Sequence, residues 1–266
     1  MSPSFYDAHV HLASPVLSQE IKGLSAAYDT INLNRAIVVG TSPDDWAQVL
    51  DLAGRDKRFV PAVGLHPWHV NEVQNDWQGR FLSFLDKGIS VIGEIGLDQW
   101  VDRYDIELQR EAFEYQLAAA TERNLPTSIH CLKAHQPLME VLRGMELPKR
   151  GFKLHAYNGP IETMKPLLDL GAHFSFNAGQ LKPNAKRVCE LIKLVPDERL
   201  LIETDAPDFL PPRELQEFQL GDPNLCHPAN IRAGYRALAT LRGCRLEIFA
   251  ESIGKNFLRY FMDEFE

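Results

Sequence analysis

Residues 5–12 read Phe5-Tyr6-Asp7-Ala8-His9-Val10-His11-Leu12, an apolar run with two histidines two positions apart. In a β-strand successive side chains point to opposite faces, so this pattern predicts that Asp7, His9 and His11 share one face. Two imidazoles and a carboxylate on one face can bind a divalent cation. A lone His-x-His pair is equally compatible with a strand that carries histidines by chance, so the later strands must decide.

Seven further strand-like runs follow, separated by helical patterns. We expect these strands at residues 35–41, 59–67, 89–97, 125–131, 151–156, 173–177 and 200–205. The clearest amphipathic helix covers residues 106–123, and two more helices are expected at roughly 228–241 and 246–262. This alternation predicts an α/β fold, a single (β/α)8 TIM barrel domain over residues 1–266, slightly elaborated with C-terminal helices. The alternative, an open doubly wound sheet, usually carries a Gly-x-Gly-x-x-Gly turn after its first strand, and none is present.

The bulk composition predicts an ordinary globular protein of the cytoplasm. The chain has 266 residues, 45% of them hydrophobic, which suits one undivided barrel with a sizeable core. No apolar run reaches about 18 residues, so we expect no membrane contact. The first strand follows Met1-Ser2-Pro3-Ser4 directly, which leaves no room for a signal peptide. The four cysteines have no Cys-x-x-Cys spacing and are expected to be reduced thiols.

The charge and the helices also constrain the partners. A formal net charge of −8 lowers the expectation of extended duplex binding, because such proteins usually carry a basic face. Phosphate chemistry would therefore need metal ions and a few local cations. No exposed apolar helix demands a partner, so we expect a monomer.

Ionisable side chains recur at the ends of the expected strands. The carboxyl ends of the strands are where barrels of this type build their sites. A buried polar group without a partner costs about 2–7 kcal/mol, so the recurrence calls for a shared partner. The residues concerned are His9, His11, Glu94, His130, His155 and Asp205.

This set has the makeup of a site for two divalent cations. We expect one ion to be held by His9, His11 and Asp205, a second by His130 and His155, and Glu94 to bridge the two. Two ions about 3.5–4 Å apart can activate a water and stabilise the entering and leaving oxygens. The donors suit zinc, manganese or iron better than a magnesium cage, and zinc, manganese and magnesium all remain open as the physiological metal.

Other polar residues near these strands have several interpretations. His66 fits an outer ligand, a phosphate donor or a loop anchor before Pro67. Asp7 is expected to orient a ligand histidine from behind. Asp98 is interpreted as a cap of the following helix and Glu203 as a buried hydrogen-bonding acid. The remaining histidines are expected at the surface or around the site: His69, His135, His173 and His227.

Read together, these residues resemble the TatD family of metal-dependent deoxyribonucleases, within the amidohydrolase-like superfamily. The match runs along nearly the whole chain and is carried by Asp7-Ala8-His9-Val10-His11, Gly64-Leu65-His66-Pro67, Gly93-Glu94-Ile95-Gly96-Leu97-Asp98, Ser128-Ile129-His130-Cys131 and Glu203-Thr204-Asp205-Ala206-Pro207. The resemblance implies hydrolysis of DNA phosphodiester bonds, commonly from the 3′ end of single strands, with two divalent metals. It also implies that the six residues above are metal ligands and that Asp205 accepts a proton from the attacking water.

The chain departs from the family's pattern around the expected metal centre. Members commonly have an arginine two residues after the strand-five histidine, where this chain has Leu132, followed by Lys133. The family's His-Cys-Phe is His155-Ala156-Tyr157 here, and its Arg-Asn-Glu-Pro stretch is Leu225-Cys226-His227-Pro228. Two cations that would meet substrate phosphates are therefore missing.

The sequence therefore predicts a metal-dependent hydrolase of ester bonds, a TatD-like deoxyribonuclease. Glu94 and Asp205 are the predicted catalytic residues, and His66, Lys133 and Tyr157 the predicted substrate contacts. One alternative is a hydrolase of amides, lactones or aminoacyl esters, because the same centre polarises a carbonyl. For that class Lys153 is conceivable as a modified lysine ligand, although Glu94 already fills the bridging role. A second alternative is a non-catalytic barrel that binds a metal or a nucleotide.

Overall fold

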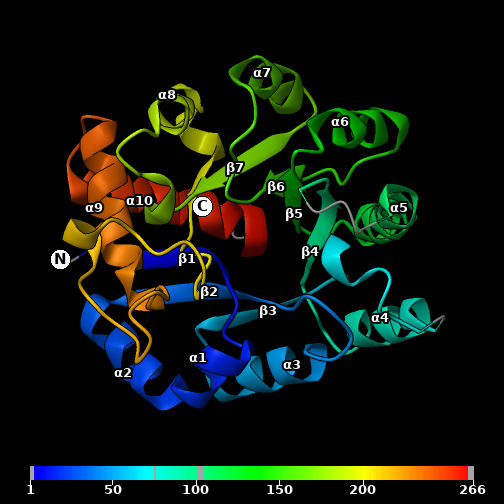
Figure 1. Cartoon of the computed structure of the whole chain (residues 1–266), viewed down its shortest axis with the longest axis horizontal. Helices are drawn as coiled ribbons and strands as arrows, with labels where there is room; N and C mark the ends of the chain where they lie inside the picture. The colour runs from blue at the N-terminus through cyan, green and yellow to red at the C-terminus, as the bar shows by residue number, and fades with distance from the viewer. Residues whose placement is uncertain (1–2, 75, 101–104, 263–266) are drawn as a thin grey trace.

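Eight parallel strands form one sheet in chain order in the computed structural model, which describes residues 3–74, 76–100 and 105–262. The strands are β1 (Phe5–Val10), β2 (Leu33–Val39), β3 (Phe59–Val63), β4 (Val91–Asp98), β5 (Thr127–Leu132), β6 (Phe152–Leu154), β7 (Ala172–Phe176) and β8 (Leu200–Ile202). Figure 1 looks along the barrel, with helices around the strands. The predicted (β/α)8 barrel is confirmed. The prediction of one domain over residues 1–266 includes 1–2, 75, 101–104 and 263–266, which lie outside the described residues.

The helices alternate with the strands much as the sequence predicts. They are α1 (Pro15–Gln19), α2 (Ile21–Ile31), α3 (Trp46–Arg55), α4 (Trp77–Leu85), α5 (Ile106–Arg123), α6 (His135–Gly144), α7 (Ile161–Asp169), α8 (Lys186–Leu194), α9 (Ile231–Leu241) and α10 (Leu246–Phe257). The helix predicted at 106–123 is confirmed as α5. The one predicted at 228–241 begins with a 3-10 turn, Pro228–Asn230, and the one predicted at 246–262 ends in a π-helical turn, Leu258–Met262.

Backbone hydrogen bonds join the first strand to the segment after the last one. The N–H of Asp205 donates to the carbonyl of His9 at 2.9 Å, and the N–H of His11 donates to that of Ala206 at 2.9 Å. The contact between β1 and the end of β8 therefore brings Asp205 beside the two histidines of the N-terminal motif.

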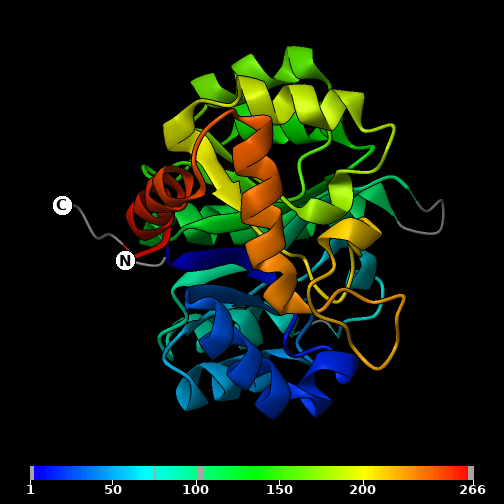
Figure 2. The ribbon, with the colours of Figure 1, turned by 90° about the vertical axis from the view of Figure 1, so that its left-hand side faces the viewer.

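The amino-terminal end of the barrel is filled with apolar side chains. Tyr6 and Val60 belong to a buried cluster from the strands, which packs against Phe257 and Phe261 of the C-terminal helical segment. Figure 2 shows α10 lying across this end, away from the loops that follow the strands. Because this end is packed and apolar, the polar residues gather at the opposite mouth.

Gly96 permits β4 and β5 to approach closely beside the polar residues. Its φ is +141°, and a Cβ atom at this position would lie 2.0 Å from the carbonyl oxygen of His130. Only glycine adopts such a backbone conformation readily and leaves that space free.

Gly96→Ala is expected to destabilise the fold by about 1–3 kcal/mol or more, because it adds backbone strain and a clash with β5. Urea unfolding checks this. Gly23→Ala is the matched control, since Gly23 lies on the exposed face of α2 with no atom within 4 Å of an added Cβ. We expect this control to be neutral or stabilising by up to about 1 kcal/mol. Equal effects of both substitutions would contradict the role given to Gly96.

Candidate active site

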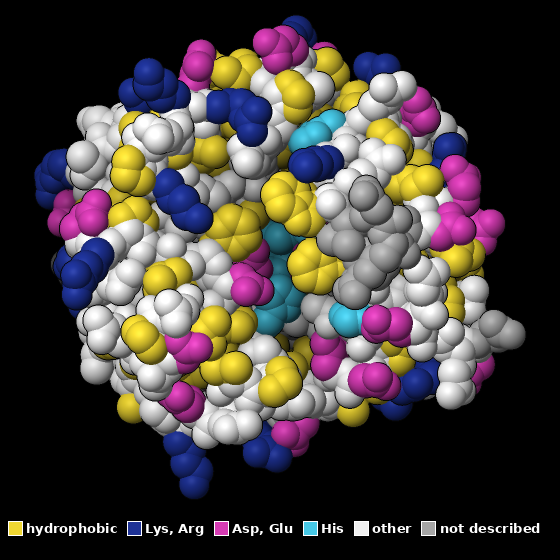
Figure 3. Space-filling model, viewed as in Figure 1, with side chains coloured by type: hydrophobic (Ala, Val, Ile, Leu, Met, Phe, Trp, Pro, Cys, Tyr) yellow, Lys and Arg dark blue, Asp and Glu magenta, His cyan; other side chains and the backbone are white. Residues whose placement is uncertain are grey.

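The carboxyl ends of the strands surround a cavity of about 1100 Å³. Its lining includes five of the six predicted metal ligands, and the sixth, His9, is fully buried beneath them. In Figure 3 the mouth is hollowed at its centre, with histidine and acidic side chains inside it and hydrophobic side chains around it. The structure therefore brings together the residues that the sequence predicts to share a site.

The two carboxylate oxygens of Glu94 face two different sets of histidines. Oε2 lies 3.3 Å from Nε2 of His9 and 3.4 Å from Nε2 of His11. Oε1 lies 2.9 Å from Nδ1 of His130 and 2.7 Å from Nε2 of His155. One side chain thus stands between two imidazole pairs, as a bridging carboxylate requires.

Asp205 lies on the His9 and His11 side of Glu94. Its Oδ1 is 3.3 Å from Nε2 of His11 and 3.6 Å from Nε2 of His9, and its Oδ2 is 3.7 Å from Nδ1 of His155. Its φ is +56°, which is uncommon for a residue other than glycine. Such strained residues persist where the surroundings fix them, and they concentrate at functional sites.

Groups behind the imidazoles determine which ring nitrogens carry protons. Nδ1 of His11 lies 3.1 Å from the carbonyl oxygen of Val39, and Nε2 of His130 lies 2.8 Å from Oδ2 of Asp98. A carbonyl and a carboxylate only accept hydrogen bonds, so these nitrogens donate. A divalent cation binds neutral imidazole, and in the neutral rings the opposite nitrogens, which face Glu94, present the lone pairs.

Several ring nitrogens face each other or have no hydrogen-bond partner. Nε2 of His9 and Nε2 of His11 are 3.1 Å apart, and Nδ1 of His130 and Nε2 of His155 are 3.2 Å apart. Nδ1 of His155 is buried without a hydrogen bond. Closely opposed imidazole nitrogens around shared carboxylates fit divalent cations, which accept several lone pairs at once. Among the described residues, one candidate metal cluster is His9, His11 and Asp205, and two others contain His155 or Glu94.

The electrostatics of the site favour ionised carboxylates. Burial raises the pKa of Glu94, but the surrounding histidines outweigh it and hold that pKa well below its usual range. Burial is the main reason why the pKa of His9 falls to about 4. Burial also opposes protonation of His11, but Asp205 and Glu94 raise its pKa to about 9.

His66 lies beside Glu94, and a backbone hydrogen bond fixes which of its ring nitrogens carries the proton. Its Nδ1 accepts the backbone N–H of Trp68 at 3.1 Å, and its Nε2 lies 3.3 Å from Oε1 of Glu94. Burial lowers its pKa to about 4, so the ring is neutral and the proton is on Nε2. His66, Glu94 and His130 form one of the three candidate metal clusters. The His66 nitrogen that faces the cavity carries a proton, however, so it donates a hydrogen bond and offers no lone pair to a metal.

Two predicted substrate contacts are not brought to this cavity. The ammonium of Lys133 lies 4.2 Å from the ring centroid of Trp100, and Lys133 is exposed and outside the cavity lining. Tyr157 is buried, with its hydroxyl 3.1 Å from the carbonyl of Pro160 and 2.7 Å from Oγ1 of Thr163. Positive φ angles at Lys133 and Ala156 turn the chain after β5 and β6, which explains these orientations.

Asp98 holds the ring of His130 and does not cap the following helix. Helix α5 is capped by Asp105, whereas Asp98 accepts hydrogen bonds from His130 and from Nε1 of Trp68, each at 2.8 Å. The interpretation as a cap is therefore wrong. Residues 94, 96 and 98 alternate on one face of β4, and this spacing could have indicated the role.

The acids of β1 and β8 also have defined partners. Asp7 accepts hydrogen bonds from the backbone N–H of His9 and from Thr204, and the pairing of β1 with β2 shifts register between Asp7 and Val10. Asp7 is therefore a buried acceptor behind His9, as expected, but it binds the backbone N–H of His9 and Thr204 rather than the imidazole ring. Glu203 is confirmed as a buried hydrogen-bonding acid, since it accepts from Ala156 N–H at 2.6 Å and from Ser175 Oγ at 2.5 Å.

The remaining histidines lie outside the group around Glu94. His69 is at the cavity rim and pairs with Glu72, and His227 is buried and caps a 3-10 turn. His135 lies 6.3 Å from the ring of Tyr157, centroid to centroid. His173 is buried and packs against Tyr260 of the C-terminal helical segment, with the two rings tilted.

Asp98→Asn is expected to reduce metal affinity or activity by about 10–100-fold, because the ring of His130 loses the acceptor that fixes its proton on Nε2. Calorimetric metal titration and hydrolysis assays measure the effect. Asp44→Asn, which neutralises an exposed acid that lines the cavity, is the control. If both variants lost the same activity, the loss would reflect the charge of the cavity rather than the orientation of His130.

Comparison with known proteins assigns the chain to a family. A family model described as TatD related DNase matches residues 6–262. The chain belongs to the TatD family. It is 28% identical over 259 residues to the uncharacterized metal-dependent hydrolase YcfH of Escherichia coli K12, which covers 96% of this chain and 94% of that one. It is also 28% identical over 261 residues to the 3′-5′ ssDNA/RNA exonuclease TatD of Pantoea ananatis, with 96% and 98% covered.

Solved structures agree with this membership. The crystal structure of YjjV, a TatD homologue from Escherichia coli K12, superposes with a TM-score of 0.87 at 27% identity and covers 97% of each chain. A TatD-family hydrolase from Entamoeba histolytica shares the fold, with a TM-score of 0.83 at 19% identity over 99% of this chain and 100% of that one. With its candidate metal clusters, this TatD-family chain is a metal-dependent hydrolase. None of its described helices combines the length and apolar character needed to cross a bilayer.

Proposed function

We propose that this TatD-family hydrolase is a deoxyribonuclease that cleaves phosphodiester bonds at the ends of single strands, from the 3′ side. The observation that carries the proposal is the position of Glu94, whose two oxygens face two separate histidine pairs at the barrel mouth. The Pantoea ananatis relative, named as a 3′-5′ ssDNA/RNA exonuclease, supports the choice of substrate.

Two divalent ions, zinc, manganese or magnesium, would be held by the six converging residues. His9, His11 and Asp205 would hold one and His130 and His155 the other, with Glu94 shared between them. When bound, such a pair supplies Lewis acidity and lowers the pKa of a coordinated water. The opposed imidazole nitrogens fit this occupancy.

The side chains around the centre supply proton transfer and substrate contact. Although burial opposes its ionisation, nearby histidines hold the pKa of Asp205 well below its usual range, so its carboxylate is ionised, which is the state that a proton acceptor for water requires. His66 presents an N–H toward the cavity and can donate to a phosphate oxygen. Trp68 and Phe209 line the cavity and are 41% and 40% exposed, so each offers a ring face on which a base can stack.

The test is hydrolysis of labelled single-stranded DNA by metal-loaded protein, with labels at the 3′ and 5′ ends in separate reactions. We expect metal-dependent shortening from the 3′ end and its loss with chelator. Parallel assays on small esters, lactones and amides address the carbonyl chemistry that the same centre could perform. Turnover of that panel without cleavage of DNA would refute the nuclease proposal, and metal binding without turnover of any substrate would favour a binding protein.

A further inference from the structure

We propose that Lys182 and Arg187 bind a substrate phosphate adjacent to the one that is cleaved. Both residues lie on the segment that runs from the 3-10 turn η2 (Ala178–Gln180) into α8, and both line the cavity. This inference rests on the proposed function. It identifies the wall of the barrel mouth that binds the nucleic acid backbone.

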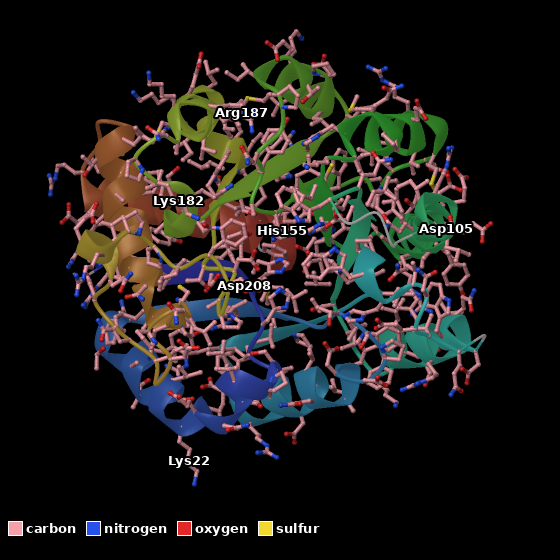
Figure 4. All side chains as sticks on the ribbon, in the orientation of Figure 1. Lys22, Asp105, His155, Lys182, Arg187 and Asp208 are labelled. Atoms are coloured by element: carbon pink, nitrogen blue, oxygen red, sulfur yellow. The ribbon has the colours of Figure 1, made fainter. Side chains whose placement is uncertain are left out.

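The charges on the cavity wall are strongly asymmetric. Among the described residues that line it, the lysine and arginine side chains are Lys182 and Arg187, whereas the carboxylates are Asp44, Asp45, Glu94, Asp205 and Asp208. Figure 4 shows Lys182 and Arg187 on the α8 side of the mouth, above His155 in the view, and Asp208 below it. A polyanion that enters the site is therefore attracted to the α8 side and repelled from the others.

No carboxylate of the described residues neutralises Lys182 or Arg187. Within the described residues neither forms an ion pair, whereas Arg58, Arg232 and Arg242 each pair with an acid. Arg187 instead donates from Nη2 to Oδ1 of Asn158 at 2.8 Å, and Asn158 also lines the cavity. This neutral partner orients the guanidinium and leaves most of its five N–H donors for a phosphate.

Hydrogen bonds attach this wall to the strand end that carries His155. Asn177 and Gln180 form a reciprocal cap of the η2 turn. The side chain of Gln180 donates to the carbonyl of Ala156 at 2.8 Å and to that of Tyr157 at 3.2 Å, directly after His155. The position of Lys182 is therefore coupled to the proposed metal centre.

Tyr157 contributes to the same wall from behind. Its hydroxyl contacts Pro160 and Thr163, which closes the loop that presents Asn158 to Arg187. Tyr157, which the sequence predicts to contact substrate, thus supports the loop that carries Asn158. Asn158 in turn binds Arg187 at the cavity wall.

Two positions at and just after the end of β5, where the resemblance leads one to expect a cation, bring no charge to the cavity. Leu132 stands where the family commonly has an arginine, and it lines the cavity without a charge. Lys133 is directed to Trp100. Among the described residues, the lysine and arginine side chains that line the cavity therefore come from the connection between β7 and α8 and from the first turn of α8.

The experiment compares K182Q/R187Q with K186Q/K193Q. Both variants remove two positive charges from the same segment, but Lys186 and Lys193 are exposed residues of α8 outside the cavity lining. The substrates are a thymidine hexanucleotide, which has neighbouring phosphates, and thymidine p-nitrophenyl phosphate, which has one. Binding of a hydrolysis-resistant phosphorothioate hexanucleotide to the metal-loaded proteins is measured at several salt concentrations.

We expect K182Q/R187Q to lose about 10–100-fold in kcat/KM on the hexanucleotide, as loss of charge-assisted contacts predicts. Its activity on the single-phosphate substrate, and that of the control on both substrates, should stay within about threefold of wild type. The magnitude of the slope of log affinity against log salt should fall by about 0.7, the value for one neutralised phosphate of a single strand.

Equal losses in the two double variants, or equal losses on both substrates in K182Q/R187Q, would overturn the phosphate site. If the wild type cleaved no phosphodiester, the proposed function would fail, and the binding measurement would decide the inference separately. An affinity and salt slope unchanged in K182Q/R187Q would then reject it, and a selective weakening would support it.

Discussion

Glu94→Ala is expected to reduce phosphodiester hydrolysis by about 10³-fold or more, the largest effect on activity for a single substitution in this protein. Glu94 is the one described carboxylate whose two oxygens each lie within 3.4 Å of histidine nitrogens from different strands. Removing it takes away the shared ligand proposed for both metal ions and leaves the two histidine pairs without the acid between them. Steady-state assays with saturating metal, together with metal analysis of the dialysed protein, measure the two consequences.

The control for this substitution is Glu72→Ala, which removes an exposed acid that pairs with His69 at the rim. We expect it to retain wild-type activity and metal content. Thermal unfolding of both variants separates loss of chemistry from loss of fold. A Glu94→Ala protein that is folded and cleaves DNA at the wild-type rate would eliminate the proposed centre.

Glu203→Leu is expected to lower the free energy of unfolding by about 3–5 kcal/mol, because it leaves the buried ammonium of Lys153 without its carboxylate. Glu203 and Lys153 are both completely buried, 3.4 Å apart, and Lys153 also donates to the carbonyl of Ala8 at 2.9 Å. The substitution in addition deprives Ala156 N–H and Ser175 Oγ of their acceptor. Denaturant unfolding of the metal-free protein measures the change without a contribution from bound metal.

A double-mutant cycle isolates the ion pair from these other bonds. Lys153→Met alone should also be strongly destabilising, because it leaves Glu203 as an unpaired buried charge. The Lys153→Met/Glu203→Leu protein should be more stable than the sum of the single losses implies, by about 1–3 kcal/mol. Strictly additive losses would show that the pair is not a coupled unit.

The sequence was sufficient to predict the barrel and the residues that meet around Glu94. Strand ends of a (β/α)8 barrel converge, so His9, His130 and Asp205 could be placed together without knowledge of side-chain geometry. Several strands are shorter than predicted, most clearly β6 and β8, because left-handed backbone conformations at Ala156 and Asp205 turn the chain soon after these strands.

Side-chain directions beyond the strand ends were not predictable in the same way. Period-two alternation fails at Asp7 because β1 shifts register, and after β5 and β6 because Lys133 and Ala156 adopt left-handed backbone conformations. Lys182 and Arg187 lie in a connection rather than at a strand end, so no periodic pattern points them into the cavity. Their position depends on long-range contacts such as those of Gln180.

The most direct test of the central claim is anomalous diffraction from crystals of the protein grown or soaked with manganese. The account predicts two peaks about 3.5–4 Å apart, with the carboxylate of Glu94 between them. His9, His11 and Asp205 should contact one peak, and His130 and His155 the other. A single peak away from Glu94, or ions bound only at surface acids, would contradict the proposal of a two-metal centre at the barrel mouth.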